Sequence, residues 1–203
     1  KLVNQNGGAV INIDGLKSDK MLKIAQSRIS KVLTVGAKKS ADLRILSQSF
    51  HDQGQKIKFC WENSEFVIDL GLYGKFQAQN VLSALACINI LEDEPSKKIE
   101  DLINYVSKLK TVPGRMEKVA SKKNGAEIFV DFAHTPSALE AVLKSIRCHF
   151  LGDIYLVFGA GGNMDVGKRS IMGKIASKLS DHVFVTDDNP RFEKPLIFFL
   201  KNS

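Results

Sequence analysis

The sequence lacks any apolar run near the ~20 residues that a membrane-spanning helix needs, so we expect no membrane partner for this chain. Its first ten residues, KLVNQNGGAV, have neither the apolar core of a signal peptide nor an initiator methionine. We therefore expect that residue 1 is not the natural start of a gene product. With 44% hydrophobic and 25% charged residues, the 203 residues suit one large globular domain or two small ones.

Cysteine is scarce, and Cys60, Cys87 and Cys148 are scattered without a Cys-x-x-Cys motif. This pattern is typical of a reduced, cytoplasmic protein. The net charge is +7, but no basic stripe with interleaved aromatic residues accompanies it, so we expect no nucleic-acid partner. We interpret the lysines as a solvated surface. Attraction of an anionic substrate is the alternative.

The first half of the chain contains short apolar runs with the periods of strands and helices. Strands are predicted at 9–13, 32–36, 43–48, 56–61 and 65–70. The turn-like composition of residues 51–56 predicts a hairpin or a meander. Helices are predicted over 19–29 with Ser18 as cap, over 76–91 as a helix buried on all sides, and over 97–109 with Ser96 as cap.

The segment TVPGR, residues 111–115, combines proline and glycine and predicts a hinge between two domains, 1–112 and 113–203. Beyond it, strands and helices alternate as βαβαβ, which predicts a parallel sheet with right-handed crossovers. The strands are predicted at 126–132, 153–158 and 182–186, and the helices at 136–149 and 167–179. Thr135 and Pro136 suit the start of the first helix, and Ile171, Met172, Ile175 and Leu179 form the expected apolar stripe of the second.

Polar clusters follow the three strands of this second domain: DFAHT (131–135), GAGGNMD (159–165) and DDNPR (187–191). In a parallel sheet, ligands bind outside the carboxyl ends of the strands. We therefore predict one shared crevice at this edge.

Each cluster also has a structural alternative. Asp131 could cap the following helix, and His134 near a helix start is more often structural than catalytic. The glycines could simply make a tight turn, and Arg191 could pair with Asp187 or Asp188. Together, at one edge, the three clusters favour a site.

The glycine-rich segment also resembles the start of a phosphate-binding P-loop, because Gly162, Gly167 and Lys168 have its spacing. Arg169 then stands where a Ser or Thr should hold magnesium, and Ser170 comes one place late. A shift of one residue turns a side chain by ~100° on a helix. We therefore do not interpret this segment as a nucleotide-binding P-loop. The N-terminus of a helix can still hold an anion.

The order of the motifs resembles the Mur ligase family, in particular members that add the third amino acid of the peptidoglycan precursor. In the second half the likeness rests on GRMEKV (114–119), VDFAHTPSALEAVL (130–143), VFGAGGNMDVGKRSIMG (157–173) and VTDDNPR (185–191). Two further stretches, AVINIDG (9–15) and YGKFQAQNVLSALA (73–86), resemble the central domain. The resemblance implies an α/β fold: part of a Mur ligase central domain followed by a Rossmann-like parallel βαβαβ unit.

The resemblance also implies an activity. Such an enzyme uses ATP and Mg²⁺ to form an amide between UDP-N-acetylmuramoyl-dipeptide and meso-diaminopimelate, through an acyl phosphate of the D-glutamate carboxylate. Matched by position, Asn80, Arg115, Asp131 and His134 would contact the nucleotide. The motif formed by Asp188, Asn189, Pro190 and Arg191 would recognise diaminopimelate. A guanidinium holds a carboxylate through two parallel hydrogen bonds.

The chain departs from the family pattern in several places. Met164 stands where diaminopimelate-adding members carry an arginine that contacts the substrate. The given residues contain neither the P-loop of the central domain nor the UDP-binding domain nor the carboxylated lysine. The family's last domain also continues beyond Arg191. These departures predict a fragment that is inactive alone.

Three other hypotheses remain open. The chain could be a small-molecule or nucleotide-binding module without chemistry, a phosphate hydrolase that uses Lys168, or the remnant of a decayed gene.

Overall fold

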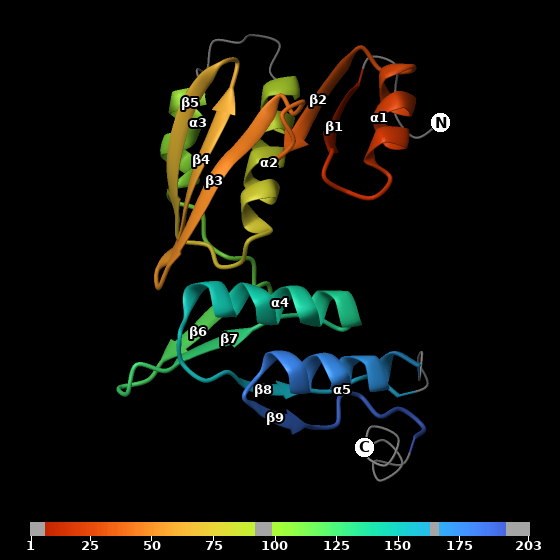
Figure 1. Ribbon diagram of the computed structural model, residues 1–203, viewed down its shortest axis with the longest axis vertical. Helices are drawn as coiled ribbons and strands as arrows, with labels where there is room; N and C mark the ends of the chain where they lie inside the picture. The colour runs from red at the N-terminus through yellow and green to blue at the C-terminus, as the bar shows by residue number, and fades with distance from the viewer. Residues whose placement is uncertain (1–6, 92–98, 163–166, 194–203) are drawn as a thin grey trace. The chain divides into compact units, whose positions relative to one another are not determined.

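A computed structural model describes residues 7–91, 99–162 and 167–193. The chain divides into two compact units, residues 1–110 and 111–203. Figure 1 shows their elements. None of the helices in the described ranges is long and apolar enough to cross a lipid bilayer.

The first unit contains a five-stranded sheet in the order β1-β2-β3-β4-β5. The strands are β1 (Gly8–Asn12), β2 (Lys31–Gly36), β3 (Leu43–His51), β4 (Gly54–Trp61) and β5 (Ser64–Leu70). Strands β1, β2 and β3 pair in parallel, and β3, β4 and β5 form an antiparallel meander. The turn between β3 and β4 confirms the hairpin or meander predicted at residues 51–56. Glu62 and Asn63, with φ of 49° and 64°, make the tight turn between β4 and β5.

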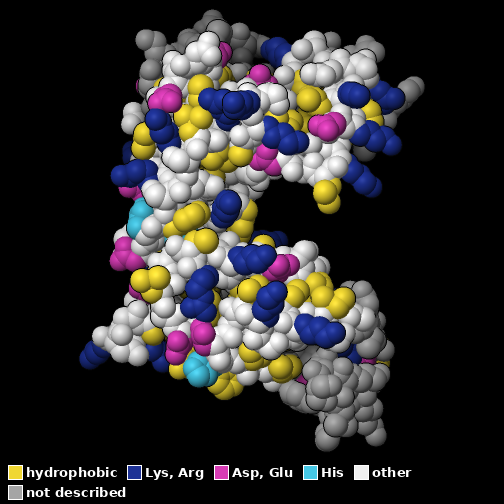
Figure 2. Space-filling view, viewed as in Figure 1, with side chains coloured by type: hydrophobic (Ala, Val, Ile, Leu, Met, Phe, Trp, Pro, Cys, Tyr) yellow, Lys and Arg dark blue, Asp and Glu magenta, His cyan; other side chains and the backbone are white. Residues whose placement is uncertain are grey.

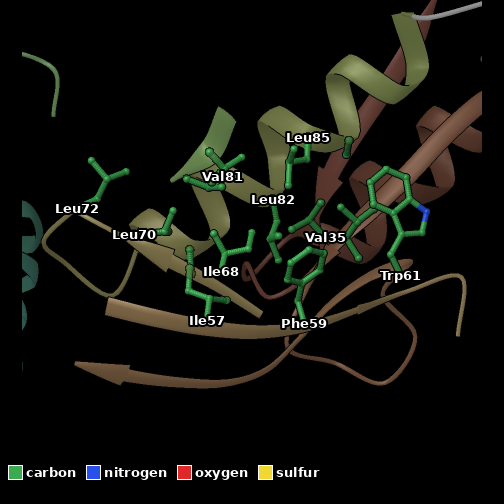
Figure 3. Close-up of a cluster of buried hydrophobic side chains, with 14 residues drawn as sticks. Val35, Ile57, Phe59, Trp61, Ile68, Leu70, Leu72, Val81, Leu82 and Leu85 are labelled. Atoms are coloured by element: carbon green, nitrogen blue, oxygen red, sulfur yellow. The ribbon is translucent and has the colours of Figure 1, made fainter. Parts of the chain in front are cut away.

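The core of this unit lies between the sheet and the helices α2 (Gln77–Leu91) and α3 (Ile99–Val106). Figure 3 shows Ile57, Phe59 and Ile68 of the sheet pointing toward α2. On the helix, the buried positions are Gln77, Ala78, Val81, Leu82, Leu85 and Ala86. The prediction that this helix is buried on all sides was wrong, because its other face, including Ala84, Cys87 and Ile88, is exposed.

Helix α1 (Ser18–Gln26) packs on the opposite face of β1. Alternation along the strand explains this, since Val10 joins the α2 core whereas Ile11 packs with Ala25 of α1. The predicted Ser18 cap was wrong. Lys17 occupies the cap position, and the Ser18 hydroxyl instead donates to the Ile13 carbonyl at 2.8 Å. Ser96, the predicted cap of the next helix, lies outside the described residues.

The second unit contains two small sheets rather than one ladder of three strands. Strand β6 (Glu117–Ser121) pairs antiparallel with β7 (Glu127–Val130), and β8 (Tyr155–Phe158) pairs in parallel with β9 (His182–Val185). Within the described residues, β7 has no ladder with β8. The predicted parallel pairing is therefore confirmed for β8 and β9 and wrong for β7, which also ends two residues earlier than expected.

Helices α4 (Pro136–His149) and α5 (Gly167–Leu179) share one hydrophobic cluster with β8. Leu139 and Leu143 of α4 meet Met172 of α5 in that cluster, with Leu156 and Phe158 against them. Ile171 does not belong to it and is half exposed. The outward side chains of the strands, Tyr155, Val157 and Phe184, are also exposed.

Candidate functional site

Two of the three predicted loops run side by side beyond β8 and β9. Gly161 pairs with Asp188 in a parallel bridge, and the Gly162 amide donates to the Asn189 carbonyl at 3.0 Å. Glycine is required here for space. A Cβ at Gly162 would collide with the Pro190 carbonyl, and one at Gly159 would crowd the Thr186 carbonyl. The two segments therefore form one continuous rim.

The predicted diaminopimelate motif lies on this rim with its polar side chains exposed. Asp188, Asn189 and Arg191 are exposed, and Pro190 is half-buried. Asn189 and Arg191 have positive φ, 34° and 55°, so the backbone turns sharply at both positions. Within the described ranges, the Arg191 guanidinium has no hydrogen-bond or ion-pair partner, and it does not pair with Asp187 or Asp188. It is available to a ligand.

A buried ion pair connects helix α5 to this rim. Arg169 of α5 is 2% exposed and holds both carboxylate oxygens of Glu193, each at 2.8 Å. It also donates to the Gly161 carbonyl at 3.3 Å. The hydrogen bonds that Arg169 donates to Glu193 raise the pKa of Arg169 above its usual value, against the opposing effect of burial. Sequence reasoning missed this pair, because Arg169 was considered only as a departure from the P-loop.

The third predicted loop, residues 131–135, is hydrogen-bonded to the same helix, α5. Lys168, beside Arg169, donates from its amine to the His134 carbonyl at 3.0 Å. This contact gives Lys168 a partner in the loop that precedes α4. Met164 and the other residues at 163–166 lie outside the described residues.

Two of the predicted nucleotide residues, Arg115 and His134, lie against one aromatic side chain, Phe132. The Arg115 guanidinium lies 5.1 Å from the Phe132 ring centre, and the His134 ring lies edge-on at 5.1 Å. The His134 Nδ1 also contacts the Phe132 carbonyl at 3.1 Å. Phe132 is 62% exposed, so the group presents an aromatic surface with a cation beside it. Sequence reasoning missed Phe132, although it stands between two candidates at a strand end.

Asp131 does not cap the following helix, as one alternative supposed. Its Oδ2 accepts from the Met116 amide at 2.8 Å, while the Thr135 hydroxyl caps α4 by accepting from the Ala138 amide. Met116 has φ of 51° and is fully buried. Asp131 therefore holds the strained entry to β6 and keeps its second oxygen available.

In the first unit, Asn80 lies exposed in the first turns of α2 and donates to Gln77 at 3.0 Å. The neighbouring residue, Gln79, belongs to a polar network. Asp14, just beyond β1, accepts from the Ala37 amide and from Gln79, both at 2.8 Å, and Asn12 donates to Gln79 at 3.0 Å. These groups meet at the carboxyl ends of the parallel strands β1 and β2. The rule that found the other loops could have found Asn12 and Asp14.

The described residues hold no group of three or more His, Cys, Asp or Glu side chains arranged to bind an ion. Lys and Arg side chains are distributed over the face shown in Figure 2, with Asp and Glu among them.

Comparison with known proteins identifies related domains in both halves. The Mur ligase middle domain model matches residues 1–88, and the model of the Mur ligase, glutamate ligase domain matches residues 114–197. The UDP-N-acetylmuramoyl-L-alanyl-D-glutamate--2,6-diaminopimelate ligase of Zymomonas mobilis is 39% identical over 188 residues. That alignment covers 93% of this chain and 38% of the relative. The chain thus spans about two fifths of the length of such relatives.

Two solved structures extend the comparison. A UDP-N-acetylmuramoyl-L-alanyl-D-glutamate--2,6-diaminopimelate ligase superposes with a TM-score of 0.63 at 33% identity, covering 97% of this chain and 40% of that one. A folylpolyglutamate synthase of Mycobacterium tuberculosis, complexed with ADP, superposes with a TM-score of 0.71 at 22% identity. It covers 96% of this chain and 42% of that one. The second likeness shows a shared fold.

Proposed function

Because this chain belongs to the Mur ligase family, whose members are ATP-dependent acid–amino-acid ligases, we propose that it carries nucleotide- and amino-acid-binding parts of a diaminopimelate-adding ligase. The reaction joins meso-diaminopimelate to UDP-N-acetylmuramoyl-L-alanyl-D-glutamate in the cytoplasm. The observation that carries the proposal is the rim formed by Gly159–Gly162 and Asp187–Arg191, with the unpaired Arg191 exposed on it.

Arg191 supplies the recognition chemistry. Diaminopimelate differs from lysine by a second carboxylate at its far end, and a guanidinium binds that group through two parallel hydrogen bonds. Asp188 lies on the same rim and offers a carboxylate for the adjacent ammonium. The Arg169–Glu193 pair keeps the rim in place before the substrate arrives, which lowers the ordering cost of binding.

The nucleotide would be held by the other predicted residues. The free oxygen of Asp131 accepts from ribose hydroxyls, Arg115 faces phosphate oxygens or the ribose, and Asn80 reads the adenine. A protein of the same fold has been solved with ADP, and ATP, when bound, supplies the phosphoryl group that activates the D-glutamate carboxylate. Mg²⁺, when bound, would neutralise part of the negative charge on the phosphate oxygens.

Calorimetry on the 203-residue chain tests the amino-acid site. We expect saturable binding of meso-diaminopimelate, weaker binding of L-lysine, and no turnover, since these residues contain no complete Gly-x-x-x-x-Gly-Lys-Ser/Thr sequence. Arg191→Lys should lower diaminopimelate affinity about tenfold and remove the preference over lysine. Arg28→Lys, an exposed change in the other unit, is the control. A preference that survives Arg191→Lys contradicts the assignment.

A binding module without catalytic activity would show the same binding. A second experiment therefore separates such a module from a part of a ligase. The corresponding change at Arg191 in a full-length ligase containing this sequence should raise KM for diaminopimelate with little effect on the KM for ATP. An enzyme that turns over normally with Arg191→Lys would contradict the proposed role.

A further inference from the structure

A cavity of about 350 Å³ lies in the first unit beside the start of β3. Strands β2 and β3 pair over only two residues, Val35 with Leu43 and Gly36 with Arg44, so residues 39–42 before β3 lie outside the ladder. The tight turn at Glu62 and Asn63 closes the far side. The lining residues are Leu33, Lys39, Ala41, Asp42, Arg44, Cys60, Trp61, Glu62 and Asn63. None of them belongs to the nucleotide or amino-acid sites proposed above.

Arg44 is the unusual member of this lining. It stands at the start of β3, opposite Cys60, and is half-buried. Its Nε is buried and has no hydrogen-bond partner, and within the described part of the chain its guanidinium forms no ion pair. A buried donor on a cation is costly when it has no acceptor. The two Nη groups at the end of a guanidinium match the two oxygens of a carboxylate.

The two acidic residues of the lining do not satisfy Arg44. Asp42 is already hydrogen-bonded to β2. Its Oδ2 accepts from the Thr34 amide at 2.8 Å and from the Thr34 hydroxyl at 2.6 Å. Glu62 lies exposed on the tight turn. Their charges nevertheless balance those of Arg44 and Lys39, so a multiply charged anion gains little attraction from the cavity as a whole.

Apolar side chains also contribute to the wall, beside the polar residues Lys39 and Asn63. Trp61 is 6% exposed and Leu33 is half-buried, and both line the same space. Small-molecule sites combine such walls with a few polar groups that fix the orientation of the ligand. One unpartnered guanidinium beside an indole and a leucine therefore suits a ligand with one carboxylate and an apolar body.

The cavity of about 400 Å³ in the second unit provides a contrast. Lys144, Arg147 and Lys178 line it, and the first two are already paired. Arg147 donates to the Asp181 carboxylate at 2.6 Å and to the Gly152 carbonyl at 2.8 Å, and Lys144 donates to Glu140 at 2.6 Å. A guanidinium that is satisfied internally offers an anion less.

We propose that the cavity at Arg44 binds a small monocarboxylate with an apolar body. Arg44 holds the carboxylate through its two Nη groups, and Trp61 and Leu33 contact the body. Lys39 lies at the same cavity and adds a second positive charge near the carboxylate.

Benzoate is a suitable probe because it combines a carboxylate with an aromatic ring. The 203-residue chain contains one tryptophan, Trp61, so its fluorescence reports directly on the cavity. We expect a saturable fluorescence change and one binding site by calorimetry. Arg44→Gln should weaken binding at least tenfold, and Arg44→Lys should weaken it less. Arg28→Gln, the same change at an exposed arginine outside the cavity, should leave binding unchanged.

Three results would overturn the proposal: no saturable binding of benzoate, equal binding by Arg44→Gln, or inorganic phosphate binding as tightly as benzoate. Benzyl alcohol, which keeps the ring and lacks the charge, should not compete. A measurement on the unaltered chain covers the case in which Arg44→Gln fails to fold. Benzoate should shift the Arg44 Nη–H proton resonances, and unmoved resonances at saturating benzoate refute the assignment.

Discussion

Arg169 and Glu193 form a two-point ion pair, in which Nη1 lies 2.8 Å from Oε2 and Nη2 lies 2.8 Å from Oε1. The arginine belongs to the first turn of α5, and the glutamate follows the Asp187–Arg191 loop by two residues. Because Arg169 also donates to the Gly161 carbonyl, one buried side chain connects both segments of the rim. The geometry of the proposed amino-acid site therefore depends on a contact outside it.

Glu193→Gln tests that dependence. The change leaves the buried guanidinium without a counter-charge, so we expect it to lower the free energy of unfolding of the second unit by about 3 kcal/mol. Hydrogen exchange should speed up in residues 186–193. Glu65→Gln is the matched control, because the Lys58–Glu65 pair is exposed and should contribute about 0–1 kcal/mol. Equal losses in the two variants would contradict a special role for Arg169.

Gly162→Ala tests the close approach of the two rim segments. A Cβ at this position collides with the backbone of Pro190, which is not free to rotate away as a side chain would be. We expect the Gly162–Asn189 hydrogen bond to break and exchange at the Gly162 amide to accelerate at least tenfold. Gly152→Ala is the control, since a Cβ there meets nothing within 4 Å. Unchanged exchange in Gly162→Ala would show that the rim is not packed as described.

Leu82→Ala tests the core of the first unit. Leu82 is fully buried between α2 and the sheet, so its loss should cost about 2–5 kcal/mol in unfolding free energy. Trp61 belongs to the same cluster, and its fluorescence follows the transition in denaturant. Leu16→Ala removes a fully exposed side chain and should change the free energy by less than about 0.5 kcal/mol. A loss below 1 kcal/mol for Leu82→Ala would contradict the packing.

Sequence patterns predicted the elements whose side chains alternate or repeat cleanly. Strands β4 and β5 were found because buried and exposed positions alternate along them, as with Ile57 and Phe59. Strand β6 was missed because its residues, EKVAS, are mostly polar and its last three are exposed. With β6 unrecognised, the antiparallel pairing of β7 could not be predicted either.

The candidate site was predicted in part for a similar reason. The rule that ligands bind beyond the ends of parallel strands brought the loops after β8 and β9 together correctly. This rule could not identify Arg169, because an arginine on a helix is expected to be exposed. The cost of burying its charge is offset by the ion pair with Glu193, which is distant in the sequence. Long-range pairing of this kind leaves no local pattern in the sequence.

Asp181→Asn tests a pH dependence of the second unit. The Ile154 amide, at 2.7 Å, and then Arg147 lower the pKa of Asp181 below its usual value. A lowered folded-state pKa contributes stability above the unfolded pKa of about 3.9, and that stability is lost as the pH falls through the folded value. The unfolding midpoint of the unaltered chain should therefore fall more steeply between pH 5 and pH 2 than that of Asp181→Asn. Asp187→Asn, a change on the exposed loop after β9, should keep the steep slope. Identical slopes in the unaltered chain and Asp181→Asn would contradict this contribution.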